Sequence, residues 1–332
     1  MLTKEQLLYT SSRQALSSIS VLPKVVIPGG AGYLGSILTE YFVAQGKEVV
    51  ILTRKPRPSE GNVHFIEWDG ETFGDWVYHL SGAGAVINLA GRTVNCRYTP
   101  KNRQEIYDSR LNSTRILGIA IECLNNPPPL WINSSSATIY RHAEDRPMDE
   151  KTGELGDGFS PDVCKKWEQT LFEAKTPQTR RVALRSTMVF GRGKGGVCEA
   201  FYRVVKRGLG GTMGNGKQYV SWIHSDDFCR AIAWIMDHEA LDGTINCASP
   251  NPISNEFFMS LFREACGMKV GLPATRWMLE FGAFFLKTET ELLLKSRWVV
   301  PTLLKESGFT LKYPHFKGAL DAILSDPRGT GF

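Results

Sequence analysis

Four glycines separate a short apolar run from an amphipathic helical pattern near the start of the chain. The apolar run is 24–28, and it continues as Pro28-Gly29-Gly30-Ala31-Gly32-Tyr33-Leu34-Gly35. The glycines fit both Gly-x-Gly-x-x-Gly and Gly-x-x-Gly-x-x-Gly spacing, and either spacing allows a tight turn with exposed backbone amides. Because a helix N-terminus adds unpaired N–H groups and a partial positive charge, this strand–loop–helix junction predicts a pyrophosphate-binding site.

Short apolar runs alternate with helical periods over the first 190 residues. Strands are expected at 24–28, 48–53, 63–67, 85–90, 130–134 and 181–186. The intervening helices include one from residue 33 that Gly46 ends, one at 101–124 and one near 161–174. This order predicts βαβ units, and their right-handed crossovers give a Rossmann-type, doubly wound parallel α/β sheet with helices on both faces.

After about residue 190 the pattern changes to Gly-rich loops and further helices, with no Pro- or Ser-rich linker. We therefore expect an N-terminal extension at 1–22 and a dinucleotide-binding Rossmann domain at 23–190, to which later segments return. A smaller, partly interwoven substrate-side lobe follows at 191–332. It includes a C-terminal helical domain at about 273–326.

Charge and cysteine usage exclude several classes of protein. The 39 Lys and Arg against 34 Asp and Glu leave a net charge of +5 without blocks of like charge, so no nucleic-acid partner is expected. Seven widely spaced cysteines without Cys-x-x-Cys indicate a reducing compartment, no disulfide framework and no metal site. The longest apolar stretch, at 277–286, is too short to span a membrane. The expected location is cytoplasmic, and the polar, amphipathic residues 1–22 leave organellar import open.

The end of the second predicted strand distinguishes between two cofactors. An NAD site places a carboxylate about 20 residues after the glycines, where it binds the ribose 2′-hydroxyl. Here the strand ends at Thr53-Arg54-Lys55, and the planar guanidinium of Arg54 suits a 2′-phosphate. The predicted cofactor is therefore NADP(H). The alternative is that Arg54 is a solvated surface residue.

Several motifs together resemble those of an extended short-chain dehydrogenase/reductase. They are the glycine loop, Asp69 after the third strand, Asn88-Leu89-Ala90-Gly91 after the fourth, the segments 131–140 and 184–191, and Trp222-Ile223-His224-x-Asp226-Asp227. Ser109-Arg110, Trp167-Glu168 and Gly208-Leu209-Gly210-Gly211 are similar to the atypical, sugar-nucleotide epimerase-like branch, which carries a C-terminal domain of unknown function. The resemblance covers about residues 24–324.

This resemblance implies a set of cofactor contacts and a reaction. The contacts would come from the glycine loop, Arg54, Asp69, Asn88, Leu89, Ala90, Gly91, Ser134 and Ser186. The reaction would be hydride transfer to a small carbonyl or sugar-type substrate.

The family's proton-transfer residues are incomplete in this sequence. The resemblance gives the catalytic serine as Ser136, but the Tyr-x-x-x-Lys dyad falls at about Ser160 and Cys164. A serine hydroxyl is a poor acid at pH 7, and a thiol cannot act as a fixed cation. Tyr140 is the remaining candidate donor, with structural packing as its alternative. Cys164 is expected to be a buried, inert thiol, and His224 with Asp226 and Asp227 to fasten the C-terminal lobe.

Two functions are favoured, and RNA binding is a third, weaker option because the sequence has no basic stripe interleaved with aromatics. The first is an NADP(H)-dependent reductase or epimerase-like enzyme, whose small substrate would be anionic if Arg92, Arg97 and Arg110 face it. The second is a non-catalytic NADPH-binding module that regulates a partner protein, which an apolar patch at 277–294 would favour. A homo-oligomer is compatible with both.

Overall fold

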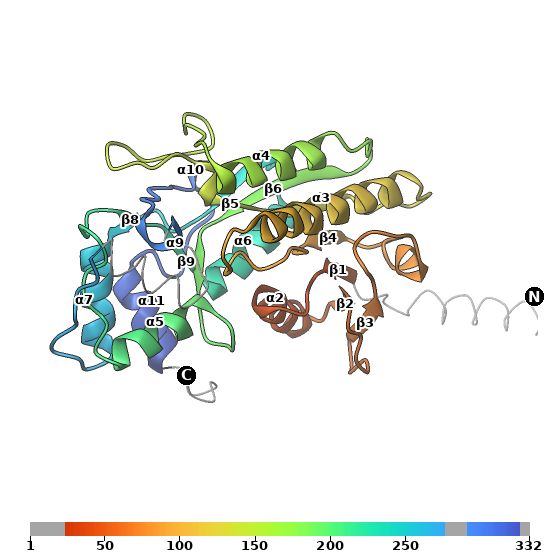
Figure 1. The fold of residues 1–332 in the computed structure, drawn as a ribbon. Coiled ribbons are helices and arrows are strands. Elements are labelled where there is room, and N and C mark those ends of the chain that lie inside the picture. The colour runs from red at the N-terminus through yellow and green to blue at the C-terminus, as the bar shows by residue number, and fades with distance from the viewer. Residues whose placement is uncertain (1–23, 276–290, 326–332) are drawn as a thin grey trace, which may run out of the picture.

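The fold is seen in a computed structural model that describes residues 24–275 and 291–325. The expected extension at 1–22 lies outside the described residues, as does the larger part of the apolar stretch at 277–294, so the patch expected there is not tested. The described chain forms a central parallel sheet with helices on both faces and a smaller helical lobe at one end (Figure 1). The predicted α/β class and the Rossmann-type sheet are therefore confirmed.

Seven parallel strands form the central sheet in the order β3-β2-β1-β4-β5-β6-β10. They are β1 Lys24–Pro28, β2 Glu48–Thr53, β3 Val63–Glu67, β4 Ala85–Asn88, β5 Leu130–Ser136, β6 Arg180–Ser186 and β10 Gly243–Cys247. Strands β1, β2 and β4 are apolar over most of their length because helices bury both faces of the sheet. The sequence did not identify β10, which returns from beyond residue 190 to lie beside β6.

Two pairs of helices cover the sheet (Figure 1). One face carries α3 Pro100–Glu122 and α4 Phe159–Phe172, and the other carries α2 Tyr33–Ala44 and α6 Ser225–Asp237. Helix α2 ends as predicted, because Gly46 adopts φ +72° and the Lys47 amide donates to the Phe42 carbonyl at 3.0 Å. This left-handed termination turns the chain directly into β2.

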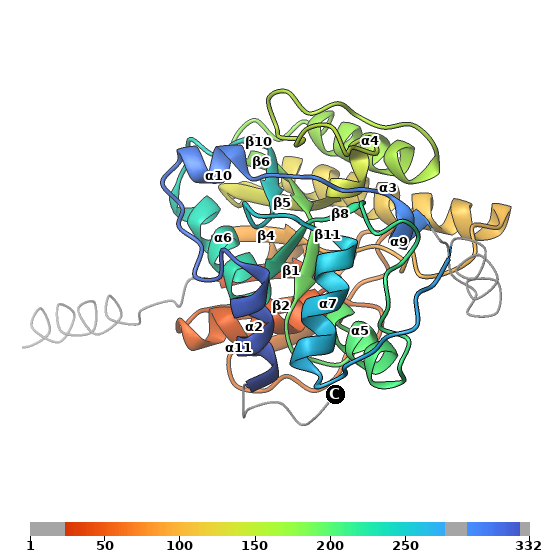
Figure 2. The same ribbon diagram turned by 90° about the vertical axis from the view of Figure 1, so that its left-hand side faces the viewer.

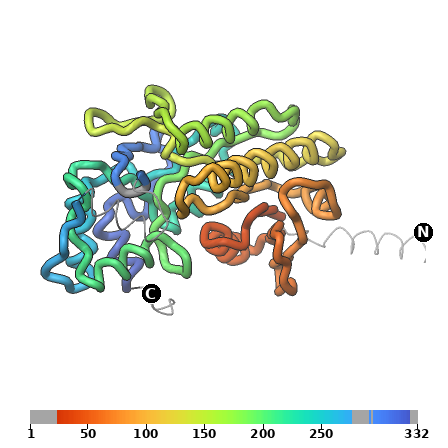
Figure 3. Tube along the Cα trace, in the orientation of Figure 1, coloured from red at the N-terminus to blue at the C-terminus, as the bar shows by residue number. Residues whose placement is uncertain are grey.

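The smaller lobe is built from segments that lie far apart in the sequence. Its helices are α5 Val197–Lys206, α7 Asn255–Ala265 and α11 Phe316–Ser325, which face the viewer in Figure 2. Two short ladders complete it: β7 Met188–Phe190 with β9 Trp222–His224, and β8 Tyr219–Val220 with β11 Ile253–Ser254. An aromatic core joins these segments, so the blue C-terminal stretch lies beside the green and cyan helices (Figure 3). Its rings are Phe190, Phe201, Phe258, Phe262 and Phe316.

The segment 222–227 fastens part of the C-terminal lobe against α6, as the sequence predicted. The carboxylate of Asp227 is fully buried and accepts the amides of Lys312 and Tyr313, both at 2.8 Å. Nδ1 of His224 caps α6 by accepting the Asp226 amide at 3.0 Å.

Short elements occupy the remaining described chain: η1 Asp75–His79, η2 Ala137–Ile139, α9 Glu291–Leu294 and α10 Thr302–Glu306.

No helix among the described residues is both long and apolar enough to cross a bilayer. Nor do three or more His, Cys, Asp or Glu side chains in these ranges converge where they could hold a metal ion. All seven cysteines lie within the described ranges as free thiols, and five of them are buried.

Candidate functional site

Two glycines of the loop between β1 and α2 are required by the fold itself. At Gly29, φ is +73°, and a Cβ there would lie 2.6 Å from the Cα of Ala90, which follows β4. At Gly35, a Cβ would lie 2.0 Å from the carbonyl oxygen of Gly30. The loop therefore packs against the end of β4, and α2 packs against the loop, at distances that no side chain permits.

Gly32 has no such internal reason to be a glycine. A Cβ at this position would have no neighbour within 4 Å, and its φ of −92° is open to any residue. It begins α2, which has no side-chain cap and no acidic residue in its first turn. The space in front of this helix N-terminus is therefore free, and its field is positive. These features fit the pyrophosphate of a dinucleotide.

Tyr33 connects this loop to the Gly-rich segment 191–196. A Cβ at Gly196 would lie 3.0 Å from the Tyr33 ring, and one at Gly191 would lie 2.7 Å from its hydroxyl oxygen. Burial raises the pKa of Tyr33, and its hydroxyl has no hydrogen-bond partner within 24–275 or 291–325. The segment 191–196 thus covers one side of the glycine loop. Of the other predicted loop residues, Leu34 packs against the core and Ala31 is exposed.

Arg54 lies at the same edge of the sheet as the glycine loop. The Gly29 amide donates to the Leu52 carbonyl at 2.8 Å, and Arg54 follows two residues later. Its side chain is exposed and has no hydrogen-bond or ion-pair partner among the described residues. A free guanidinium beside the loop fits the 2′-phosphate that the sequence predicts there.

Asp69 shapes the loop that follows β3. Its Oδ1 accepts the amides of Glu71 at 2.8 Å and Thr72 at 2.9 Å. These bonds, together with one from the Thr72 hydroxyl, lower the pKa of Asp69. The carboxylate therefore has a role within the protein, and its contact with the cofactor stays a prediction.

The turn after β4 is fixed by a buried amide. Asn88 is fully buried, donates through Nδ2 to Asn133 Oδ1 at 2.6 Å, and accepts the Ala90 amide at 3.0 Å. The side chain thus joins β4 to β5 and is used inside the protein. In the motif 88–91, the backbone groups of Leu89, Ala90 and Gly91 therefore remain available to a ligand.

Two serines lie side by side at the carboxyl ends of β5 and β6. Ser136 and Ser186 are register partners, with Ser134 two residues earlier on β5. The hydroxyl of Ser186 is buried and has no partner in the described part of the chain, whereas Ser136 Oγ accepts the Thr138 amide at 3.2 Å. A buried hydroxyl without a partner is unfavourable unless a ligand or a water satisfies it. This edge therefore fits the nicotinamide end of a dinucleotide.

Tyr140 has a structural position in place of the catalytic one suggested by the sequence. Only 1% of the residue is exposed, and its hydroxyl accepts from Arg185 at 2.9 Å. The same hydroxyl lies 3.0 Å from both the Asp149 carbonyl and Asn246 Oδ1, and burial raises its pKa. Because these groups enclose the hydroxyl, it is not available to protonate a substrate.

A buried ion pair supports this edge of the sheet. Arg185 on β6 donates to both carboxylate oxygens of Glu168 on α4, at 2.8 and 2.7 Å. The Ser135 hydroxyl donates to the same carboxylate at 2.6 Å. Sequence reasoning missed this network, although an arginine directly after the apolar residues 182–184 was a signal of a buried partner.

The two positions that the family's dyad would occupy hold other contacts. Ser160 donates to Glu291 at 3.0 Å, and burial raises the pKa of Cys164 to about 12, which makes it the inert thiol that was expected. Lys295 donates through Nζ to the Thr138 carbonyl at 2.8 Å. Sequence reasoning did not identify Glu291 or Lys295, because both come from the C-terminal segment.

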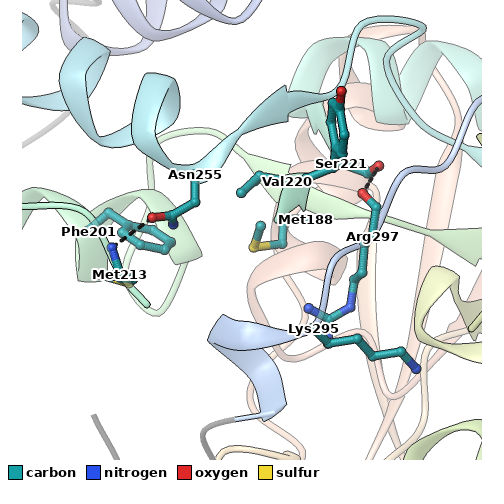
Figure 4. Close-up of a pocket in the computed structure, with 9 residues that line it drawn as sticks. Met188, Phe201, Met213, Val220, Ser221, Asn255, Lys295 and Arg297 are labelled. Atoms are coloured by element: carbon teal, nitrogen blue, oxygen red, sulfur yellow. Dashed lines mark hydrogen bonds between the residues drawn. The ribbon is translucent and has the colours of Figure 1, made fainter. Parts of the chain in front are cut away.

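Lys295 and Arg297 line a small hollow of about 20 Å³ together with Met188, Phe201 and Asn255 (Figure 4). The two cations extend from one C-terminal segment, which Ser221 holds by donating to the Arg297 carbonyl at 2.6 Å. Lys295 also lines a second cavity of about 770 Å³. That volume is in the range of small-molecule sites.

Residues 25–248 match the NAD dependent epimerase/dehydratase family, and residues 274–323 match a domain of unknown function, DUF1731. The chain belongs to the NAD dependent epimerase/dehydratase family. The family predicted from the motifs is thus confirmed, and so is the presence of the C-terminal domain.

Relatives resemble the chain over nearly its whole length. The human epimerase family protein SDR39U1 is 28% identical over 307 residues, covering 91% of this chain and all of the relative. The Bacillus subtilis epimerase family protein YfhF is 27% identical over 303 residues, covering 91% and 98%. A crystal structure of human SDR39U1 with NADPH aligns with a TM-score of 0.81 and 28% identity, covering 91% of this chain and 99% of that one.

Proposed function

We propose that this protein binds NADP(H) and transfers hydride to a small carbonyl or sugar-type substrate. The observation that carries the proposal is the open, uncapped N-terminus of α2 at Gly32, beside the unpaired guanidinium of Arg54. Human SDR39U1, which was crystallised with NADPH, has the same overall fold and supports this choice of cofactor.

Different residues of the site would bind different parts of the cofactor. The amides around Gly32 would bind the pyrophosphate and Arg54 the 2′-phosphate. The backbone of Leu89, Ala90 and Gly91 would lie along the nucleotide, and Ser136 and Ser186 would bind its nicotinamide end. When bound, the cofactor supplies a hydride.

The substrate is expected to be small and anionic. Arg92 pairs with Glu105, whereas Arg110 has no carboxylate partner among the described residues. Arg110 donates instead to the carbonyls of Arg92 and Ile106, at 3.0 and 3.2 Å. A guanidinium without a counter-ion near the end of β4 favours a ligand that carries a carboxylate or a phosphate.

We expect the protein to act in a reducing compartment, because its cysteines are free thiols. The cytoplasm is our first choice. Organellar import is the alternative, since an Arabidopsis thaliana relative is named as chloroplastic.

A single methyl group tests the cofactor site. Gly32→Ala would place a methyl where the pyrophosphate approaches, in a position free of protein neighbours. We expect calorimetric titration to show NADPH affinity at least about tenfold weaker, with the melting temperature of the ligand-free protein unchanged. Gly318→Ala is the matched control, because its Cβ also meets no neighbour and it lies in α11. Equal NADPH affinity in both variants would contradict the proposed site.

A second function is favoured by the residues at the dyad positions. Ser160 and Cys164 cannot replace a tyrosine and a lysine, which fits a module that binds NADPH and signals its presence to a partner. Oxidation of NADPH across a panel of aldehydes, ketones and keto acids separates the two. Turnover supports the enzyme, and tight NADPH binding with no turnover supports the module.

A further inference from the structure

The C-terminal segment places a lysine at the carboxyl end of β5. Lys295 directly follows α9, and its Nζ donates to the Thr138 carbonyl at 2.8 Å, two residues beyond Ser136. Only 11% of its side chain is exposed. An ammonium group therefore lies at the edge of the sheet where the proposed function puts the reacting end of the cofactor.

Lys295 and Glu291 reach the positions where the family's dyad is missing. Ser160 and Cys164 lie one helical turn apart on α4, and Glu291 and Lys295 lie one turn apart at α9. Glu291 accepts the Ser160 hydroxyl at 3.0 Å, while Lys295 and Cys164 interact electrostatically. The carboxylate of Glu291 thus contacts the serine, and the amine of Lys295 lies near enough to the thiol to interact with it electrostatically.

The surroundings of Lys295 make it a stronger acid than an ordinary lysine. Burial lowers the pKa of Lys295 to about 8, and the positive charge of Arg297 acts in the same direction. Glu291, whose Oε1 lies 4.0 Å from Nζ, and the Cys164 thiol oppose this shift. At pH 7 the amine therefore still holds its proton, and it releases that proton more readily than an exposed lysine would.

Lys295 also borders space that a substrate can occupy. It lines the cavity of about 770 Å³ with Glu291, His142, Asn215 and Gln218. These polar groups surround a volume sufficient for a small ligand. The amine thus lies between the carboxyl end of β5 and a cavity of substrate size.

We propose that Lys295, supplied by the C-terminal segment, is the proton donor of the reduction, in place of the absent tyrosine. This inference rests on the proposed function. As hydride adds to the carbonyl carbon, the π electron pair moves to oxygen, and that oxygen takes a proton from Nζ. NADPH is oxidised to NADP⁺, the carbonyl compound is reduced to an alcohol, and the neutral amine regains a proton from water.

The first test needs no substrate. Trace acetylation of the wild-type full chain with acetic anhydride between pH 6 and 11, read by mass spectrometry, compares Lys295 with the exposed Lys305 of α10. We expect the labelling midpoint of Lys295 to lie about two pH units below the ordinary lysine value of about 10.4. Saturating NADPH should lower the labelling of Lys295 several-fold and leave that of Lys305 unchanged. A midpoint of Lys295 at the ordinary lysine value, or labelling of Lys295 that does not change with NADPH, overturns the proposal.

The second test uses whichever carbonyl compound the NADPH oxidation panel identifies. Lys295→Met should lower kcat at pH 7 by about 10²- to 10⁴-fold and leave the NADPH dissociation constant within about threefold of wild type. Lys295→Arg keeps a cation but holds its proton too strongly, so it should bind NADPH and remain slow. Lys305→Met is the control that retains wild-type turnover.

The outcomes separate this inference from the proposed function. Failure of the wild-type protein to bind NADPH contradicts the proposed function itself. Normal NADPH binding together with undiminished turnover in Lys295→Met contradicts only the role of Lys295. Recovery of turnover in Lys295→Arg would assign the residue a purely electrostatic role and also overturn proton donation.

Discussion

The two ends of the proposed cofactor site are built in different ways. The glycine end comes from one continuous segment, 28–35, whose backbone conformation and close backbone packing form the site. The end at Ser136 is assembled from β5, β6, α4 and the C-terminal segment around Lys295. A local motif is readable in a sequence because its parts are neighbours in the chain. An assembled site depends on contacts that only the fold creates.

The largest effect is expected from adding a methyl group to the glycine end. In Gly35→Ala, the new Cβ would lie 2.0 Å from a backbone oxygen that cannot move without breaking the loop. We expect a loss of at least about 4 kcal/mol in the free energy of unfolding, measured in urea. Gly46→Ala, which has a positive φ but no close neighbour, should cost only about 1 kcal/mol. A loss at Gly35 as small as that at Gly46 would show that the loop moves to accommodate the added methyl group.

The assembled end is tested next by breaking its buried ion pair. Glu168→Gln keeps the size of the side chain but leaves the Arg185 guanidinium buried without a counter-charge. We expect urea unfolding to show a loss of about 3–5 kcal/mol. Lys317→Ala removes exposed pairs with Asp321 and Glu264 and should cost less than about 1 kcal/mol. A loss at Glu168 as small as that control would mean that the pair contributes little to this edge.

Removing the guanidinium at Arg54 should have a moderate effect on cofactor choice. Arg54→Ala is expected to weaken NADPH binding by about 10- to 100-fold and leave NADH binding unchanged, because only NADPH carries the 2′-phosphate. Fluorescence titration with both dinucleotides measures this ratio. Arg57→Ala is the control, since Arg57 lies over the Phe65 ring near the same strand end. An equal loss for both dinucleotides would place Arg54 away from the 2′ position.

The smallest effect concerns the stability cost of burying Lys295. Burial lowers its pKa from 10.5 to about 8, so between these pH values the unfolded chain binds more protons than the folded one. The free energy of unfolding therefore rises as the pH increases from about 8 to 10.5. At pH 7 the full destabilisation caused by burying the charged lysine is present. Lys295→Met should raise the melting temperature by a few degrees at pH 7 and lose that advantage near pH 10. A lower melting temperature at pH 7 would show that the bond to Thr138 outweighs the cost of burial.

The same contrast explains how much of the fold could be predicted. The strands β1, β2 and β3 begin and end where the sequence indicated, because continuous apolar runs and the flanking turn residues are local signals. The glycine loop followed from its own spacing. The seventh strand, β10, was missed because its five residues carry a weak pattern, and its position beside β6 is a property of the sheet.

The end of the site at Ser136 could not be predicted from the sequence, for a physical reason. Tyr140 was a reasonable candidate from its spacing after Ser136, but only the fold reveals that Arg185 and Asn246 enclose its hydroxyl. Lys295 lies 159 residues after Ser136, and nothing in its immediate sequence distinguishes it from a surface lysine. Its burial arises where the C-terminal segment meets η2 and α4.

The buried carboxylate of Asp227 shows why the two family matches do not mark two independently folding units. It lies in the first match, and the amides of Lys312 and Tyr313 that satisfy it lie in the second. A fragment truncated near residue 250 would keep the ion pair of Asp227 with Arg230 but lose both of these amides, and would also lose Leu304 and Phe309 from the hydrophobic core. The C-terminal half is therefore as much a part of the scaffold as the sheet.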